Sequence, residues 1–330
     1  MKKVVVFTTG GTIAMKYDEG KGGLVPAVSG EDLARAVPGL EKLAQIEVRE
    51  FSNVASCNMS PQRMFELSKV IAKALDEPDV VGAVVTHGTD TLEETAYLLD
   101  LLHDSDKPIC VVGAMRGASD ISADGPANIY CAVQVAASDV ARGKGVFVVL
   151  NNLIHAAAQV RKTHSANCDT FDSPWWGPVG YCEPDRVVFR RAPLGRQIFH
   201  PESLKARVDV VSAQTGMGSE YVDFALSQGV DGIVLEGYGR GNLPPAMIAG
   251  IARARANGVA VVIATRTAAG RPFETYAYPG SVGDAKVHGA VRGAEASAAQ
   301  NRLKLMVALS EDPSLASEPR RLEAIMDGGS

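Results

Sequence analysis

The chain has 330 residues, of which 46% are hydrophobic and 22% are charged, and its formal net charge is −5. This composition excludes a disordered chain and a collagen-like chain. A mildly acidic chain without a dense run of lysine and arginine lacks the positive charge that binding to nucleic acid requires. The longest apolar runs, such as Val4–Phe7 and Gly145–Leu150, are too short to cross a bilayer, so we expect no membrane span.

Short runs rich in β-branched residues alternate with helical patterns along the chain, which is typical of parallel strands connected by helices. The sequence therefore predicts an α/β fold. The predicted strands, in chain order, are Lys3–Thr8, Ile46–Phe51, Val80–Thr86, Pro108–Gly113, Gly145–Leu150, Val208–Ser212, Gly232–Glu236 and Val259–Thr265. Most of them are largely apolar, as burial on both faces of a parallel sheet requires.

Four segments carry helix signals. The dipeptide Ser60-Pro61 places a capping hydroxyl before a proline at the first helical position, and the segment Asp90–Glu93 fits an acidic capping box. Further helices are predicted over Pro244–Ala256 and Ala294–Leu309.

The length of the chain favours two domains, because one hydrophobic core is near its upper size limit here. The alternation of strands and helices gives way to a polar stretch with proline and arginine, Arg190–Arg196. We therefore expect an N-terminal domain over residues 1–188, a linker over residues 189–206 and a C-terminal domain over residues 207–330.

The five cysteines are odd in number and contain no C-x-x-C pair, so the sequence predicts neither a disulfide framework nor a zinc site. We expect most of them to be reduced and packed in the interior. The first residues, Met1–Val6, resemble the start of a signal peptide, but the polar segment Thr8–Thr12 interrupts the apolar run. We therefore expect a cytoplasmic protein.

Two turns that follow predicted strands are the first candidates for a site, because open parallel sheets bind ligands beyond the carboxyl ends of their strands. In the first turn, Gly10 and Gly11 let the backbone bend sharply and bring amide groups close to a ligand. No dinucleotide or P-loop fingerprint follows this strand, which makes phosphate binding a weak hypothesis. The second turn, Thr86–Thr91, gathers hydroxyls, an imidazole and a carboxylate at the end of a buried strand.

Threonine hydroxyls beside glycine amides offer a nucleophile and an oxyanion hole, which together suit acyl transfer. Lys162 is a candidate base for the hydroxyl proton. The same residues also fit structural roles: Thr12 as a turn or capping hydroxyl, Asp90 as a helix cap, His87 as a hydrogen-bonded core group and Lys162 as a solvated charge. The residues alone therefore indicate an α/β enzyme, with a hydrolase as the favoured class.

The chain resembles the bacterial-type L-asparaginase family, which includes the glutaminase-asparaginases, over essentially its whole length. The most specific segments are Thr9–Ala14 and Thr86–Ala96. Further similar segments, in the expected order, are Gly113–Arg116, Ser122–Pro126 and Gly241–Leu243. The family implies a larger N-terminal domain with a mostly parallel sheet flanked by helices, and a smaller C-terminal α/β domain.

The resemblance also implies a catalytic mechanism without metal or cofactor. Thr12 would attack the side-chain amide carbon of the substrate and form an acyl-enzyme that water hydrolyses. Thr89, Asp90 and Lys162 would form a second catalytic cluster, in which Lys162 tunes the hydroxyl of Thr89. That hydroxyl would polarise either the amide or the attacking water.

The family assigns the substrate contacts to several turns. Ser56 and Asp90 would hold the α-carboxylate and α-amino groups, and the carbonyl of Ala114 would contact the leaving amide. Gly11 and Gly88 would add contacts from the two glycine-containing turns. Because both charged ends of the substrate are bound, the reacting carbon is positioned.

Members of the family are homotetramers built as dimers of dimers, and their active sites lie between the N-terminal domain of one subunit and the C-terminal domain of a neighbour. Asn242 fits the position that reaches across from that neighbour. Glu274 matches an acidic residue that contacts the substrate amine, although its spacing differs from that of relatives.

Two segments depart from the family pattern. Relatives have Gln or Ser, and then often Asp, where this chain has Cys57 and Asn58 in the substrate turn. Relatives also carry a lid tyrosine where Leu24 stands here, and Tyr17 is the only nearby phenol that could replace it. The catalytic rate and the substrate specificity can therefore differ from those of the relatives.

The leading hypothesis is hydrolysis of L-asparagine to L-aspartate and ammonia. One alternative is an amidohydrolase of the same scaffold that prefers L-glutamine or a D- or modified amino acid. Another is a non-catalytic protein that binds an amino acid, and a nucleotide-binding enzyme is a distant third because its glycine fingerprints are missing.

Overall fold

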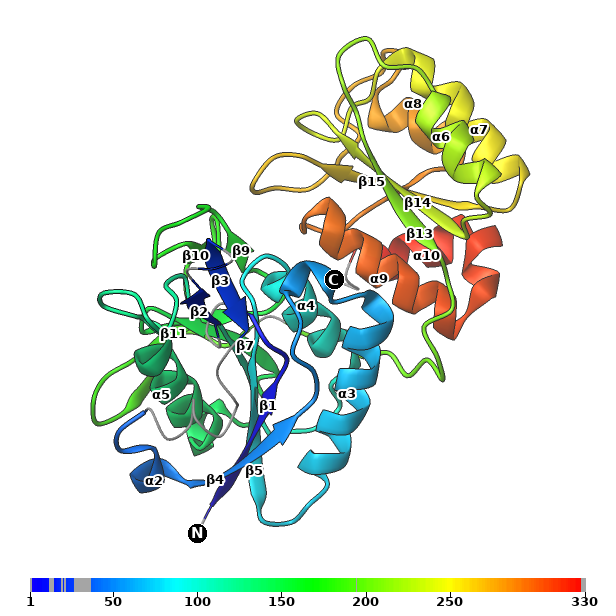
Figure 1. Cartoon of the computed structure of the whole chain (residues 1–330). Helices are drawn as coiled ribbons and strands as arrows, with labels where there is room; N and C mark the ends of the chain where they lie inside the picture. Colours follow the sequence, from blue (N-terminus) through cyan, green and yellow to red (C-terminus); the bar gives the residue numbers. More distant parts are fainter. Residues whose placement is uncertain are drawn as a thin grey trace. The chain divides into compact units, whose positions relative to one another are not determined.

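The computed structural model describes residues 2–11, 15–18, 20, 22–26, 37–193 and 195–327. It divides into two compact units, residues 1–198 and 199–330, which run from blue to green and from green to red in Figure 1. The boundary between the units lies inside the segment 189–206. Each unit has its own sheet and its own hydrophobic core.

The first unit is built on an eight-stranded sheet with the order β12-β11-β8-β7-β6-β5-β1-β4. Strands β4, β1, β5, β6 and β7 pair in parallel, and the remaining pairings are antiparallel. The strands are β1 Lys3–Thr8, β4 Gln45–Glu50, β5 Val80–Thr86, β6 Ile109–Val112, β7 Val146–Leu150, β8 Leu153–Ala156, β11 Gly180–Cys182 and β12 Val187–Phe189.

Helices cover both faces of this sheet, with α3 and α4 on one face and α5 on the other (Figure 1). The helices are α2 Leu40–Leu43, α3 Pro61–Leu75, α4 Leu92–Leu102 and α5 Gly125–Ala136, with short 3-10 helices η2 Ser56–Asn58 and η3 Asp139–Ala141. As predicted, the side chain of Ser60 caps α3 by accepting a hydrogen bond from the backbone of Arg63.

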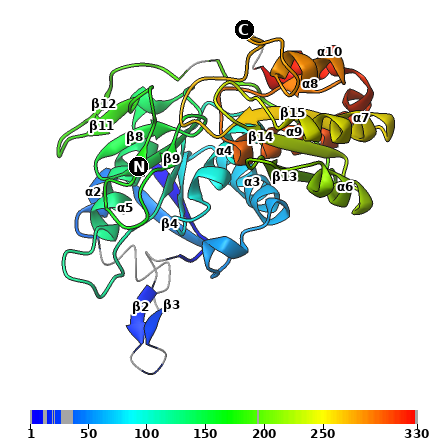
Figure 2. The ribbon, with the colours of Figure 1, turned by 90° about the horizontal axis from the view of Figure 1, so that it is seen from above.

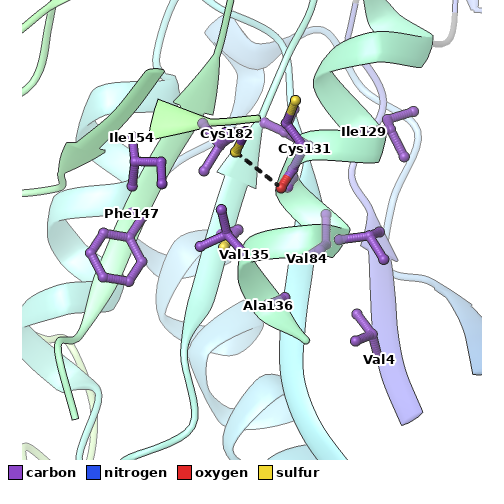
Figure 3. Packing of buried hydrophobic residues seen from close by; sticks show 14 of the residues in the cluster. Val4, Val84, Ile129, Cys131, Val135, Ala136, Phe147, Ile154 and Cys182 are labelled. Atoms are coloured by element: carbon purple, nitrogen blue, oxygen red, sulfur yellow. Dashed lines mark hydrogen bonds between the residues drawn. The ribbon is translucent and has the colours of Figure 1, made fainter. Parts of the chain in front are cut away.

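Apolar residues fill the space between α5 and the sheet. Figure 3 shows Val4, Val84 and Phe147 from the strands facing Ile129 and Val135 from the helix. All five side chains are buried. Because the central parallel strands are covered on both faces, they are apolar along their whole length, which is why the sequence located them well.

Two small hairpins accompany the main sheet. One pairs β9 Arg161–Lys162 with β10 Phe171–Asp172. The other pairs β2 Met15–Asp18 with β3 Gly23–Pro26 and stands apart from the main sheet (Figure 2).

The second unit has a parallel four-stranded sheet with the order β13-β14-β15-β16. Helices α6, α7 and α8 lie on one side of the sheet and α9 and α10 on the other (Figure 1). The elements are β13 Val208–Ser212, α6 Glu220–Ser227, β14 Gly232–Gly237, η4 Pro245–Met247, α7 Ile248–Ala256, β15 Ala260–Thr265, α8 Val282–Val287, β16 Val291–Arg292, α9 Ala298–Glu311, η5 Pro313–Ser317 and α10 Pro319–Met326.

The predicted α/β class and the eight predicted strands are confirmed, and three strands have the predicted bounds. The predicted starts of two helices are wrong. The helix predicted from Pro244 begins with a 3-10 turn, and α7 follows it. The helix predicted from Ala294 begins at Ala298, because Ser297 and Gln300 form a capping box that sets the start of α9.

All five cysteines are free, and Cys110, Cys131 and Cys182 are buried, as expected for packing residues. Cys57 is exposed and Cys168 is partly exposed. None of the described helices combines the length and the apolar character needed to cross a membrane.

Lys304 is a buried amine in the second unit. Its side chain lies on α9, is 4% exposed and donates a hydrogen bond of 3.2 Å from Nζ to the carbonyl oxygen of Met326. Burial lowers the pKa of Lys304 to about 8, and the nearby charge of Asp327 opposes this shift. Between this value and the ordinary lysine pKa of 10.5, the folded protein therefore binds fewer protons at this position than the unfolded chain.

We predict that the free energy of unfolding rises by up to ~3 kcal/mol from pH 7.5 to pH 10.5 through Lys304 alone, since one pKa unit corresponds to about 1.4 kcal/mol. Lys304→Met removes the titrating group, so the variant should lack this rise. Denaturant titrations of both proteins across that range measure it.

The matched control is Lys205→Met, because Lys205 is an exposed lysine of the same unit. Its stability should follow the wild-type pH dependence. If Lys304→Met also followed the wild-type curve, the buried amine would not be the titrating group.

Candidate active site

The turns after β1 and β5 touch each other through their glycines. Strands β1 and β5 are parallel neighbours in which Thr8 is paired with Thr86, so the chain leaves both strands at the same edge of the sheet. Gly11 has φ +87°, and a Cβ atom added to it would lie 2.3 Å from the Cα and N atoms of Gly88. Only glycine permits this approach and this backbone conformation together.

Thr9 and His87 hold the two turns in place. Both the backbone N–H and the hydroxyl of Thr9 donate to the carbonyl oxygen of Thr86, at 3.1 and 2.9 Å. His87 is fully buried, its Nδ1 donates to the carbonyl oxygen of Gly88 at 2.7 Å, and its Nε2 accepts from the hydroxyl of Thr95 at 2.9 Å. Burial lowers the pKa of His87 to about 4, so the ring is neutral and structural at pH 7.

Lys162 joins the second turn from a distant part of the chain. Its Nζ atom lies 2.9 Å from the Oγ1 atom of Thr89 and 2.8 Å from the Oδ1 atom of Asp90. The side chain is 18% exposed, so it is not the solvated surface charge that the sequence also allowed. The backbone N–H of Lys162 donates to the carboxyl group of Glu93, which holds the end of β9 against α4.

The predicted acidic capping box at Asp90–Glu93 is wrong. The N-cap of α4 is Thr91, and its side chain makes no capping hydrogen bond. The polar groups have other partners: the Asp90 carboxylate pairs with Lys162, and the Thr91 hydroxyl donates to the carbonyl oxygen of Ser56 at 2.7 Å. Burial raises the pKa of the Glu93 carboxyl, which lies against the backbone of Lys162.

Ser56 lies beside the two glycine turns. It is buried, and its Oγ accepts a hydrogen bond from the backbone N–H of Asp90 at 3.3 Å. A Cβ atom on Gly88 would lie 2.7 Å from this oxygen, so glycine is required here too. Cys57 and Asn58 follow Ser56 in η2, and both are exposed.

Ala114 follows β6 and is held by residues to which the sequence assigned no role. The carbonyl oxygen of the preceding residue, Gly113, accepts from Asn128 Nδ2 at 3.0 Å. The carboxylate of Asp124 accepts from the backbone N–H groups of Met115 and Arg116, at 3.0 and 2.9 Å. Asp124 lies in a segment that resembles the family, which is the one signal in the sequence that pointed to it.

Two predicted catalytic residues, Thr12 and Tyr17, have no described side-chain contacts. Thr12 lies outside the described residues. Tyr17 is paired with Leu24 across the β2–β3 hairpin. Within the part of the chain that the structure describes, no cluster of three or more His, Cys, Asp or Glu side chains could hold a metal ion.

Asn242 and Glu274 belong to the second unit. Asn242 lies in a turn in which its backbone N–H donates to the carbonyl oxygen of Tyr238, and its Oδ1 is buried without a hydrogen-bond partner among the described residues. Glu274 pairs with Lys286 at 2.5 Å and with Arg292 at 3.4 Å.

Models of two protein domains match nearly all of the chain. The N-terminal asparaginase domain matches residues 3–195, and the glutaminase/asparaginase C-terminal domain matches residues 207–321. The chain belongs to the asparaginase family. This agrees with the resemblance carried by the two glycine-containing turns.

Comparison of the chain with individual proteins indicates the same family. The chain is 37% identical over 309 residues to the L-asparaginase of Bacillus licheniformis, covering 94% of this chain and 96% of the relative. It is 33% identical to L-asparaginase 2 of Escherichia coli, covering 99% and 93%. The crystal structure of a probable cytoplasmic L-asparaginase from Campylobacter jejuni superposes with a TM-score of 0.87 at 34% identity, covering 99% of both chains.

We predict that Gly11→Ala lowers the free energy of unfolding by about 2–5 kcal/mol, because the new Cβ adds steric overlap with Gly88 to the strain of a positive φ. Thermal and denaturant unfolding of the purified variant measure the loss.

Gly143→Ala is the matched control. Gly143 also has a positive φ, +69°, but a Cβ atom there would meet nothing within 4 Å. It should therefore lose only about 1–2 kcal/mol, the cost of the backbone conformation. Equal losses in the two variants would show that the contact between the turns is not tight.

Proposed function

We propose that this protein hydrolyses L-asparagine to L-aspartate and ammonia. The observation that carries this function is the position of Lys162 Nζ, within hydrogen-bond distance of both the Thr89 hydroxyl and the Asp90 carboxylate. Lys162 is 73 positions from Thr89 and 72 positions from Asp90 in the sequence, and its contact with both is hard to explain by helix capping or surface solvation.

In the proposed mechanism, the Thr12 hydroxyl attacks the side-chain amide carbon of asparagine. The threonine ester forms, and the amide nitrogen leaves as ammonia after taking the hydroxyl proton. A water molecule then attacks the ester, which releases aspartate and restores the Thr12 hydroxyl. Lys162 donates to Thr89 Oγ1, which leaves the hydroxyl proton of Thr89 free to polarise the amide or to orient the water.

The two charged ends of the substrate bind to groups that the described contacts leave available. Ser56 Oγ accepts from the backbone of Asp90, so its own O–H can donate to the α-carboxylate. The Asp90 side chain is 69% exposed and can accept from the α-amino group. The amides of Gly11 and Gly88 and the carbonyl oxygen of Ala114 complete the contacts around the reacting amide.

We propose that asparagine is preferred over glutamine. Glutamine is longer by one methylene, and a pocket discriminates such a change by about 1–3 kcal/mol. Cys57 offers a weaker hydrogen bond than the Gln or Ser expected from the resemblance, and Asn58 lacks the charge of Asp. Both side chains are exposed beside Ser56, so we expect a weaker hold on the substrate carboxylate.

The proposed active enzyme is a homotetramer, a dimer of dimers in which the domain over residues 207–330 completes the site of a neighbouring subunit. The match of residues 207–321 to the glutaminase/asparaginase C-terminal domain supports this proposal. Glu274 would reach the same site only while sharing its carboxylate with Lys286 and Arg292.

We also propose that the protein is cytoplasmic, with residues 189–206 as the linker between the domains. The free state of all five cysteines and the name of the Campylobacter jejuni relative support this location.

Ammonia release from asparagine and glutamine, measured side by side, tests the proposed function. We predict a higher kcat/KM for asparagine and detectable turnover of glutamine. Thr12→Ala should abolish both activities because it deletes the attacking oxygen, whereas Thr12→Ser keeps the oxygen and should keep part of the activity. Near-wild-type turnover by Thr12→Ala would overturn the mechanism, and tight binding of asparagine without ammonia release would favour an amino-acid-binding protein.

We predict that Lys162→Met lowers kcat by about 100-fold or more while KM changes less, since the methionine keeps most of the side-chain volume but removes the donor to Thr89. Steady-state kinetics with asparagine measure both constants. The control is Lys69→Met, which removes an exposed lysine of α3 and should leave kcat unchanged. An unaltered kcat in Lys162→Met would show that Lys162 has a structural role and no catalytic one.

A further inference from the structure

Two buried thiols border one cavity of the first unit. Cys131 on α5 and Cys182 on β11 (Figure 3) are 7% and 9% exposed. Both line a cavity of about 490 Å³. Gln134 lines the same cavity, and its Oε1 is buried without a hydrogen-bond partner among the described residues. The lining of the cavity therefore combines two thiols with a buried amide side chain.

The two cysteines are in direct contact. The Cys182 thiol donates to the carbonyl oxygen of Cys131 at 3.8 Å, which is the dashed line in Figure 3. The Cys131 thiol donates to Asn152 Oδ1 at 3.3 Å. The contact between the two thiol side chains lowers the pKa of Cys131, whereas the same contact and burial raise the pKa of Cys182. A thiol with the lower pKa supplies more of the thiolate that attacks a peroxide.

Hydrogen bonds connect this pair to the loop that carries Ala114. Both cysteines bind Asn152, because the backbone N–H of Cys182 donates to its carbonyl oxygen at 2.8 Å. Asn151 and Asn152 have positive φ values of 50° and 63°, so the turn between β7 and β8 depends on such support.

The neighbouring Asn151 continues the connection. Its backbone N–H donates to Asn128 Oδ1 at 2.9 Å, and Asn128 Nδ2 donates to the carbonyl oxygen of Gly113. A Cβ atom on Gly113 would lie 3.0 Å from the Thr89 side chain. Successive contacts therefore connect the two thiols, the turn formed by Asn151 and Asn152 (the asparagine turn) and the loop after β6 that carries Ala114 (the Ala114 loop).

We propose that Cys131 and Cys182 are a modification site that a hydroperoxide converts reversibly into a disulfide. The Cys131 thiolate attacks one peroxide oxygen and breaks the O–O bond, which gives a sulfenic acid and water or an alcohol. The Cys182 thiol then attacks the sulfenic sulfur, forms the S–S bond and releases water. Two thiols are oxidised by two electrons, and one peroxide is reduced.

The disulfide removes both S–H donors, so the side-chain oxygen of Asn152 loses its hydrogen bond from Cys131. The asparagine turn is then held less firmly. Because Asn128 binds both this turn and Gly113, the Ala114 loop is held less firmly too. Turnover of the oxidised enzyme should therefore fall, a consequence that rests on the proposed function, whereas formation of the disulfide does not.

The first test counts thiols in the wild-type protein. Titration with hydrogen peroxide, followed by denaturation and alkylation, should reduce the alkylated cysteines from five to three. Peptide mapping should join Cys131 to Cys182, and dithiothreitol should restore all five. A bond that joins other cysteines, or a sulfenic acid that persists at Cys131 while Cys182 stays free, overturns the proposal.

Variants separate the pair from the remaining thiols. Cys182→Ala should leave Cys131 as a sulfenic acid that dimedone traps, and the matched control Cys57→Ala, at the exposed cysteine, should still form the bond. If Cys182→Ala does not fold, mapping of the wild-type protein decides the matter alone.

The second test measures asparagine hydrolysis before and after oxidation. A fall of about 2- to 30-fold that dithiothreitol reverses, and that Cys182→Ala does not show, supports the connection to the Ala114 loop. Unchanged turnover in a protein whose disulfide has been mapped would overturn that connection. Absence of turnover in the reduced protein would instead overturn the proposed function and leave the thiol count valid.

Discussion

The contact between Gly11 and Gly88 is the constraint on which the candidate active site of the first unit depends. Two parallel strands that are direct neighbours end at the same level, so the turns that leave them must pass one another. An added Cβ at Gly11 would overlap the backbone of Gly88, and one at Gly88 would overlap Ser56. Three segments that are far apart in the sequence are therefore packed closely together, with their amide and hydroxyl groups at one edge of the sheet.

Within this frame, the sequence predicted the elements whose signal is local. The buried parallel strands are continuous apolar runs, and Ser60-Pro61 is a self-contained helix start. The position of Lys162 had no such signal. It depends on the β9–β10 hairpin and on the bond from its backbone to Glu93, which are contacts between residues separated by many positions. The family resemblance supplied the role of Lys162, and the fold supplied the geometry.

The capping box at Asp90 failed for a related reason. A carboxylate at the start of a helix can cap its own backbone or pair with a distant cation, and the local sequence is the same in both cases. Here Lys162 is the charged partner of the Asp90 carboxylate, and the backbone carbonyl oxygen of Ser56 accepts a hydrogen bond from the Thr91 hydroxyl. Asp124 and Asn128 were missed because their hydrogen bonds run to backbone groups after β6, and a backbone group leaves no mark in the sequence.

The site is therefore supported mainly by polar side chains that bind main-chain groups. Thr9, His87, Asp124 and Asn128 each fix a backbone segment that would contact the substrate. Such hydrogen bonds are directional, and a buried polar group that loses its partner destabilises the fold. A small displacement of one of these side chains therefore displaces the backbone segment and the side chain bound next to it. Asn152 belongs to the same series, since its side chain depends on the Cys131 thiol. Oxidation of a cysteine outside the candidate site would in this way alter the loop that carries Ala114.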